Sequence, residues 1–150
     1  MNDLRRAACA VIAATTLALF GGCATGGLAR VTVPLTATLS AEAEVPPNDS
    51  TGTGSFEGRY ERTTRTLSWR VSYLGLTGPL TGAHLHGPAL PGANAGVALP
   101  LPGPHASPFE GRAQLTPEQA EALLDGRWYV NLHTARHPGG EIRGQVRPLP

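Results

Sequence analysis

The stretch that decides the fold is Leu67-Ser68-Trp69-Arg70-Val71-Ser72-Tyr73-Leu74, in which apolar and polar residues alternate. Successive side chains of a β-strand point to opposite faces, so Leu67, Trp69 and Val71 share one face. The polar residues between them share the other. An apolar face of this kind has to be covered by a second layer of the protein. The stretch therefore predicts a half-buried strand in a packed β domain.

The same alternation recurs along the chain between runs rich in glycine and proline. Residues 31–40 carry it first, with Pro34 near the start, where a missing N–H is tolerated. Residues 54–60 and 67–74 predict a hairpin joined across 62–65. Further strands are expected at 82–86, 96–101, 109–115, 127–134 and 141–147. About eight short strands predict an all-β fold, an antiparallel immunoglobulin-like or Greek-key sandwich or barrel.

One helix is expected to interrupt the strands, at about residues 117–125. Thr116-Pro117-Glu118-Gln119 is a capping box with proline at the first helical position, and Gly126 ends the helix. Ala120 and Leu123 belong to its one apolar stripe. We expect this helix to cover an open end of the sandwich and to have an architectural role only.

The first residues indicate an export signal and not a part of the fold. Arg5 and Arg6 precede an uncharged run of 14 residues, Ala7–Phe20. That is the length of a signal-peptide core and shorter than the roughly 20 residues of a spanning helix. Small residues then stand directly before Cys23, an arrangement that resembles a bacterial lipobox. Phe20 departs from the leucine that is usual at its position.

These features predict how the whole chain is organised. A signal peptide is expected over residues 1–22, a lipidated Cys23 with its tether over 23–32, and one domain over 33–148. Ala24 stands where an inner-membrane retention signal has aspartate, which favours the outer membrane in an organism that has one. The alternative is ordinary signal cleavage near Ala24, with loss of the cysteine and a secreted or periplasmic soluble protein.

Charge and composition exclude several classes of function. The chain has 12 basic residues, all arginine, against 11 acidic ones, a net charge of +1. No basic stripe is present, so no nucleic-acid partner is expected, and membrane contact is expected only through the lipid anchor. There is no Gly-x-Ser-x-Gly elbow or phosphate-binding glycine loop. Glu42 and Glu44, two residues apart, are expected on a solvated edge.

Two short motifs hold three histidines at strand spacing. In Gly82-Ala83-His84-Leu85-His86-Gly87 both imidazoles point to one face of the strand. In Trp128-Tyr129-Val130-Asn131-Leu132-His133-Thr134 the apolar residues mark the core face, so the histidine is expected on the outer one. Neutral imidazole nitrogens bind copper and zinc. The pattern raises the hypothesis of a metal site formed by His84, His86 and His133.

Other polar residues are expected on the same outward face. This supporting polar network comprises Tyr129, Asn131, Glu141, Arg143 and Gln145. The alternative to a metal site is purely structural: the histidines hydrogen-bond across strands, with Glu141 and Arg143 paired beside them. His105 and His137 lie in loops rich in proline and glycine and are weaker candidates.

The motifs taken together resemble a known family. Ala83–Pro88, Leu123–Gly126, Tyr129–Thr134 and Pro138–Val146 look like the CHRD domain, a module named for its occurrence in chordin and widespread in bacterial secreted proteins. The resemblance covers about residues 33–148. It implies an immunoglobulin-like β-sandwich or barrel. Because chordin is an extracellular binding protein, the resemblance also implies a binding or structural role, and it supplies no catalytic residues.

A second similarity concerns copper-zinc superoxide dismutase, which also uses a Greek-key β-barrel and a His-x-His strand for copper. His84 and His86 resemble that strand. No aspartate lies between Asp49 and Asp125 to complete a zinc site of that type, and no cysteine pair is present. We therefore expect no dismutase activity. Binding of a single copper or zinc ion stays open.

The sequence thus predicts an extracytoplasmic CHRD-domain lipoprotein, a non-catalytic binding or structural module of the cell envelope. A protein or glycan partner fits that role, with the stretch 87–108 as a candidate surface, and no cofactor is required. The alternative is a copper- or zinc-binding protein that uses the His-x-His site, with a redox role. The sequence favours a role without catalysis and leaves open whether the protein is an enzyme.

Overall fold

The structure is a computed structural model that describes residues 31–103 and 105–150. The expected signal peptide and lipidated Cys23 lie outside the described residues. Within them the chain forms β1 (Thr32–Ser40), β2 (Thr53–Glu61), β3 (Thr66–Leu74), β4 (Leu80–His86), β5 (Val97–Pro100), β6 (Phe109–Gln114), α1 (Pro117–Leu124), β7 (Tyr129–Thr134), β8 (Ile142–Gln145) and β9 (Arg147–Pro148).

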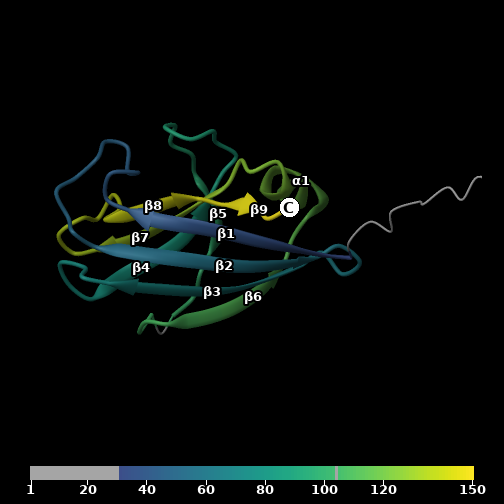
Figure 1. Ribbon diagram of the computed structural model, residues 1–150, viewed down its shortest axis with the longest axis horizontal. Coiled ribbons are helices and arrows are strands. Elements are labelled where there is room, and N and C mark those ends of the chain that lie inside the picture. The colour runs from purple at the N-terminus through teal and green to yellow at the C-terminus, as the bar shows by residue number, and fades with distance from the viewer. Residues whose placement is uncertain (1–30, 104) are drawn as a thin grey trace, which may run out of the picture.

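All nine strands belong to one antiparallel sheet. Its order is β5-β4-β7-β8-β1-β2-β3-β6, and β9 pairs with β1 beside β8. The sheet curls on itself into a half-barrel, so that β4, β5 and β7 lie behind β1, β2 and β3 (Figure 1). The expected antiparallel all-β class with one short helix is confirmed. The sequence left open a sandwich of two sheets or a barrel. The structure has one sheet, which curls into a half-barrel (Figure 1).

The hairpin expected in the first half of the chain is confirmed. Strands β2 and β3 pair along their whole length, from Thr53 opposite Leu74 to Glu61 opposite Thr66. Strand β1 pairs with β2 over nine positions and contains Pro34 near its start. The turn between β2 and β3 ends at Arg65, whose φ of 53° is left-handed.

The alternating apolar faces meet inside the curl. Leu67, Trp69 and Val71, the residues that predicted the fold, are 0–5% exposed. They pack with apolar side chains from the other half of the sheet, among them Leu85, Val130 and Ile142. Burying one such side chain contributes about 1.5–3 kcal/mol, so the core is the main source of stability.

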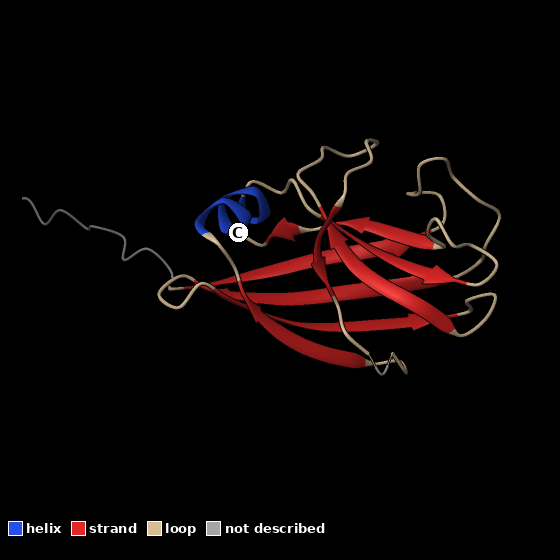
Figure 2. Ribbon diagram, turned by 180° about the vertical axis from the view of Figure 1, so that it is seen from behind, coloured by secondary structure: helices blue, strands red, loops and turns tan. Residues whose placement is uncertain are grey.

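Helix α1 forms as the sequence predicts and packs at one end of the sheet beside β9 (Figure 2). The Thr116 side chain accepts a hydrogen bond from the Gln119 amide at 3.2 Å, and the Gln119 side chain accepts one from the Thr116 amide at 3.0 Å. Gly126, with φ of 69°, follows the helix. In the part of the chain that the structure describes, no helix has the length and apolar character needed to cross a membrane.

The outer face of β4, β7 and β8 differs from the expectation. The sequence predicts that Tyr129, Asn131 and His133 project outward from the core on a polar outer face, yet all six residues of β7 are buried. The β1–β2 loop (residues 41–52) and the β4–β5 loop (residues 87–96) both rise on this side of the sheet (Figures 1 and 2). Side chains on this face therefore point away from the core and are covered by loops.

A substitution at Gly144 tests how closely β8 approaches β1. A Cβ on Gly144 would lie 2.3 Å from the Thr38 carbonyl oxygen, which is backbone and cannot swing away. We expect Gly144→Ala to lower the free energy of unfolding by about 1–3 kcal/mol, measured by urea denaturation. Gly139→Ala is the matched control, because a Cβ there meets nothing within 4 Å. Equal losses in the two variants would contradict the close approach.

Candidate metal centre

The pairing register arranges the polar side chains of the covered face in rows. Across β4, β7 and β8 the rows are His86, Tyr129 and Gln145, then His84, Asn131 and Arg143. In the next row His133 stands opposite Gly82, which has no side chain. The three histidines therefore converge at the β4–β7 boundary, and the amides and the guanidinium lie toward β8.

The structure brings His84, His86 and His133 together, as the metal hypothesis requires. One ring nitrogen from each lies within 4.8 Å of the other two. Nδ1 of His84 is 3.1 Å from Nε2 of His133. His133 is buried, and the other two are half-buried. No other group of three histidine, cysteine or acidic side chains in the described residues comes as close.

Backbone carbonyls fix the orientation of two of the rings. Nδ1 of His133 donates to the Pro138 carbonyl at 3.1 Å, and Nδ1 of His86 donates to the Ala95 carbonyl at 3.0 Å. A neutral imidazole that donates from Nδ1 carries its lone pair on Nε2. Nε2 of His86 is buried without a hydrogen-bond partner. Metal-binding histidines usually donate their other ring N–H to a carbonyl or carboxylate in this way, which fixes the orientation of the ring.

Gly82 makes room for the cluster. A Cβ at Gly82 would lie 3.3 Å from Cε1 of His84 and 3.9 Å from Cδ2 of His133. Any larger residue at this position would push on the His84 ring. The glycine that precedes the His-x-His motif thus lets two rings from neighbouring strands approach each other.

Electrostatics keep the imidazoles neutral. Burial lowers the pKa of His84, His86 and His133 below the usual histidine value. Neighbouring imidazoles lower it further at His84 and His133. The two backbone carbonyls act in the opposite direction and are outweighed. Uncharged rings keep a lone pair available for a cation at neutral pH.

The donor set fits copper or zinc better than a hard cation. Three imidazoles with no carboxylate suit Cu or Zn, whereas Ca²⁺ and Mg²⁺ take oxygen ligands. Nitrogens at about 2.0–2.1 Å from one ion lie roughly 3.4 Å apart in a tetrahedral arrangement. The His84–His133 pair, at 3.1 Å, is already near that spacing. The 4.8 Å limit on the trio means that the third nitrogen has to move by at most about 1.4 Å.

Glu141 belongs to the polar network, but not in the arrangement expected. Its carboxylate accepts hydrogen bonds from the Ser50 hydroxyl, from the amide and hydroxyl of Thr77, and from the Thr134 hydroxyl, at 2.5–2.8 Å. Burial raises the pKa of this carboxyl, but these bonds outweigh burial and hold the pKa below its usual value. The expected pairing of Glu141 with Arg143 is wrong.

Arg143 instead holds the β4–β5 loop against the sheet. Its Nη1 donates to Oδ1 of Asn94 at 2.9 Å, and its Nη2 donates to the Ala93 carbonyl at 2.7 Å. The guanidinium lies 3.4 Å from the centre of the Tyr129 ring, which stacks on His86 with ring centroids 5.0 Å apart. The supporting network therefore links the loop, the tyrosine and one member of the histidine cluster.

Glu44 is a buried residue that the sequence placed on a solvated edge. Only 6% of it is exposed, and its Oε2 accepts a hydrogen bond from the Asn131 amide at 3.3 Å. Burial raises the pKa of Glu44 to about 7, against the smaller effects of Arg143 and Asn131. No local pattern reveals this, because the burial comes from the β1–β2 loop folding over β7.

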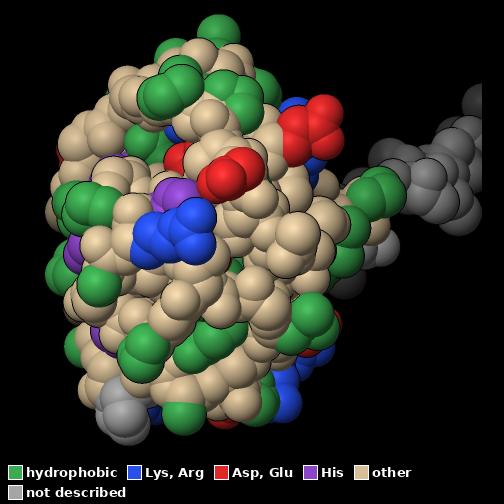
Figure 3. Space-filling view, turned by 90° about the vertical axis from the view of Figure 1, so that its left-hand side faces the viewer, with side chains coloured by type: hydrophobic (Ala, Val, Ile, Leu, Met, Phe, Trp, Pro, Cys, Tyr) green, Lys and Arg blue, Asp and Glu red, His purple; other side chains and the backbone are tan. Residues whose placement is uncertain are grey.

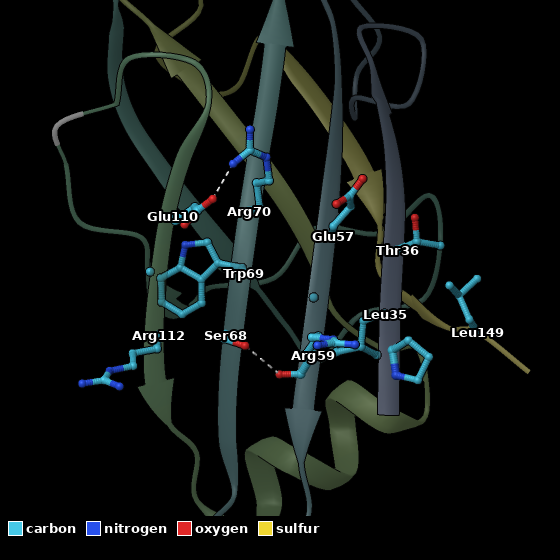
Figure 4. Close-up of a pocket in the computed structure, with 13 residues that line it drawn as sticks. Leu35, Thr36, Glu57, Arg59, Ser68, Trp69, Arg70, Glu110, Arg112 and Leu149 are labelled. Atoms are coloured by element: carbon cyan, nitrogen blue, oxygen red, sulfur yellow. Dashed lines mark hydrogen bonds and ion pairs between the residues drawn. The ribbon is translucent and has the colours of Figure 1, made fainter. Parts of the chain in front are cut away.

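A larger cavity, of about 730 Å³, lies away from the histidines on the outer face of β1, β2, β3 and β6 (Figure 4). Its charged lining residues, Glu57, Arg59, Arg70, Glu110 and Arg112, are all exposed. Arg70 and Glu110 form an ion pair. Solvated charges of this kind are usual on an outer sheet face, so the cavity does not compete with the histidine cluster as a chemical site.

The two weaker histidine candidates stay outside the cluster. His105 contacts the Leu101 carbonyl through Nε2 at 2.7 Å, and His137 lies in the turn after β7. Figure 3, which faces the loop-bearing end of the sheet, shows histidine side chains at separate points of the surface. Neither His105 nor His137 belongs to the three-histidine cluster.

The fold and site together define an antiparallel half-barrel with a covered polar face and a three-histidine cluster at its margin. The model of the CHRD domain family matches residues 35–146. The chain therefore belongs to the CHRD domain family, and the resemblance seen in the sequence is confirmed. No curated protein and no solved structure matches it significantly.

The Glu141 carboxylate is expected to stabilise the fold. In Glu141→Gln an amide NH₂ meets hydroxyl and amide donors, so we expect a loss of about 2–3 kcal/mol in the free energy of unfolding at pH 7. The folded-state pKa is lowered, so the carboxylate's contribution is present above the unfolded-state pKa and is lost as pH falls through the folded-state value. Urea denaturation at pH 7 and pH 3 measures both effects. Exposed Glu110→Gln is the control, with a change below about 0.5 kcal/mol.

Ionisation of Glu44 is expected to lower the stability of the fold, whereas ionisation of Glu141 raises it. Its folded-state pKa of about 7 lies above the ordinary value of 4.5, so stability falls as pH rises from 4.5 through 7. Glu44→Gln removes this ionisation, and we expect it to raise the Tm by about 3–5 °C at pH 8 and by less at pH 5. Thermal denaturation followed by circular dichroism tests this. A variant less stable than wild type at pH 8 would contradict it.

Proposed function

We propose that the chain is a non-catalytic binding module of the bacterial cell envelope, and that its ligand is a single copper or zinc ion. His84, His86 and His133 supply the ligand nitrogens. The observation that carries the proposal is the convergence of three ring nitrogens, one from each histidine, within 4.8 Å. In addition, Nε2 of His86 is buried and has no hydrogen-bond partner. A purely structural network would need only pairwise contacts among the rings.

Orientation of the rings supports a metal over a structural role. Nε2 of His86 and Nε2 of His133 carry lone pairs, because both Nδ1 atoms donate to backbone carbonyls. The contact between His84 and His133 places one proton between two nitrogens, and a metal ion can take its place when the His84 ring carries that proton on Nε2 instead of Nδ1. Binding therefore needs a change of tautomer and a small movement of the His84 ring, with no net loss of a proton and no change in the strands.

The proposed place of the domain outside the cytoplasm is inferred from the N-terminal residues. A signal peptide over residues 1–22 and lipidation of Cys23 would hold the domain outside the cytoplasm, on the outer membrane of a diderm organism. Cleavage without lipidation would leave a secreted or periplasmic soluble protein. In either case the domain meets metal ions outside the cytoplasm.

The test is a titration of the full chain in detergent micelles with Cu(II) and with Zn(II), followed by calorimetry. We expect one ion per chain with Kd below about 1 μM, which is about −8 kcal/mol. The His84→Ala/His86→Ala double variant should weaken binding at least about 100-fold, because one imidazole alone is left. His105→Ala is the matched control and should bind as wild type does, since that ring lies outside the trio.

A spectroscopic readout separates this site from adventitious binding at exposed side chains. Electron paramagnetic resonance of the Cu(II) complex should show coupling to three nitrogens, reduced to one in the double variant. Binding weaker than roughly 100 μM, about −5.5 kcal/mol, would contradict the proposal. The histidines would then be structural, and the module's partner would be sought among proteins and glycans.

A further inference from the structure

Strand β6 forms an open edge of the curled sheet. The strand order runs from β5 at one edge to β6 at the other, and within the described residues β6 pairs only with β3. In Figure 1, β6 lies at the lower margin of the sheet, and no described segment is drawn beyond it. The loop that leads into β6 turns toward β3, because the Ser107 hydroxyl accepts a hydrogen bond from the Tyr73 amide at 2.8 Å. The far side of β6 is therefore left uncovered.

The hydrogen-bond pattern shows which main-chain groups of β6 face this edge. In an antiparallel pair of strands, residue pairs that exchange hydrogen bonds alternate with pairs that do not. The Leu115 amide donates to the Arg65 carbonyl at 2.8 Å, so every second residue before it, from Ala113 back, also bonds to β3. The N–H and C=O groups of Glu110 and Arg112 therefore point away from β3. Both residues are exposed.

The same two residues carry opposite charges on the outer face of the edge strand. Glu110 and Arg112 are two positions apart, so their side chains share that face, with Gly111 between them. Glu110 forms an ion pair with Arg70 on β3. Arg112 has no ion pair among the described residues, and Figure 4 shows its side chain extending away from β3. The edge thus presents an unpaired cation beside an anion.

We propose that two copies of this chain pair through β6, antiparallel and around a two-fold axis at Gly111. In that register Glu110 of each copy lies opposite Arg112 of the other, so two pairs of opposite charges face each other across the interface. Both residues also direct their main-chain groups toward the other copy, so each such pair exchanges two hydrogen bonds. The charges and the hydrogen-bond pattern select the same register independently.

Shifted registers are disfavoured by the same two side chains. A slide by two residues in one direction places Glu110 opposite Glu110 of the other copy, and a slide in the other direction places Arg112 opposite Arg112. Like charges directly opposite each other in a sheet destabilise the pairing. A slide by one residue places main-chain groups that face the other copy opposite groups already bonded to β3. The edge therefore specifies one register.

The inner face of the edge also suits a second copy. A Cβ on Gly111, at the proposed axis, would collide with the indole ring of Trp69, so the ring occupies the space of the missing side chain. Phe109 and Ala113, two positions away on either side, face the core. The two-fold axis places Phe109 of one copy opposite Ala113 of the other, which continues the apolar layer across the interface.

The opposite edge of the sheet is less open, which favours a closed dimer. Strand β5 has four residues and ends at Pro100, and its Ala98 carbonyl already accepts a hydrogen bond from the Gln119 side chain at 3.0 Å. Proline has no N–H for a further strand. Pairing of β6 with β6 uses the same surface on both copies and ends at two chains, whereas pairing of β6 with β5 would build fibres.

The test is sedimentation equilibrium of the full chain in an excess of density-matched detergent micelles, with EDTA present to exclude dimers bridged by a metal ion. We expect a reversible dimer with a Kd on the order of 100 μM, because an interface of a few strand residues is small. Glu110→Arg and Arg112→Glu should each weaken dimerisation at least about tenfold, since each places like charges opposite each other. Glu57→Arg, an exposed position on β2, is the matched control and should dimerise as wild type does.

Two combinations of the reversed charges test the register itself. The double variant Glu110→Arg/Arg112→Glu places opposite charges across the interface again, so it should dimerise as wild type does. An equimolar mixture of the two single variants should also dimerise, because each chain meets the opposite charges of the other. Thermal denaturation of each variant confirms folding. Recovery in the mixture cannot come from repair of a misfolded chain, because neither chain is changed by mixing.

Amide hydrogen exchange locates the contact on the strand. The amides of Glu110 and Arg112 should exchange about fourfold more slowly at about 1 mM protein than at about 10 μM, because only the monomer leaves them open. The amides of Gly111 and Ala113, bonded to β3, should exchange slowly at both concentrations. A wild-type chain that stays monomeric at about 1 mM, single variants that dimerise as wild type does, or a mixture that stays monomeric would each overturn the proposal.

Discussion

The buried carboxylate of Glu141 is the interaction on which the covered face depends. It accepts four hydrogen bonds, which come from the β1–β2 loop, the β3–β4 loop and strand β7. These segments are far apart in the sequence and meet at one end of the half-barrel. A single anion that takes donors from all of them fixes the loops without a disulfide. A charge that is fully enclosed is tolerable only when it is paired or well hydrogen-bonded, and here hydroxyl and amide donors replace a basic partner.

The covering loops turn one face of an ordinary sheet into a second interior. The core inside the curl is apolar, whereas the layer under the loops is made of imidazole, amide, guanidinium and carboxyl groups. Polar groups removed from water need partners, and most of them find loop backbone or small side chains. The buried side-chain atoms of the described residues that lack a hydrogen-bond partner include Nε2 of His86 in the histidine cluster. The others are Oε1 of Glu44, Oδ1 of Asn131, Nε2 of His137 and Oε1 of Gln145.

Much of the architecture could be read from local pattern. Alternation in residues 67–74 predicted β3, the capping box predicted α1, and the closing motif indicated the family that residues 35–146 match. The histidine cluster was also predictable, because residues two apart on a strand share a face. The loop residues that complete the site were not. Ser50 and Thr77 bind Glu141, and Asn94 binds Arg143, yet each stands in a stretch whose composition indicates only a loop.

The sequence by itself determined the strands, the helix and which side of each strand carries apolar groups, because these follow from periods of two and 3.6 residues and from caps a few residues long. Only the tertiary structure decided what covers the other side. Burial of Glu44 and the separate partners of Glu141 and Arg143 depend on where the β1–β2, β3–β4 and β4–β5 loops pack. Loop paths are set by contacts between residues about 50–90 positions apart in the chain, and a local pattern carries no record of them.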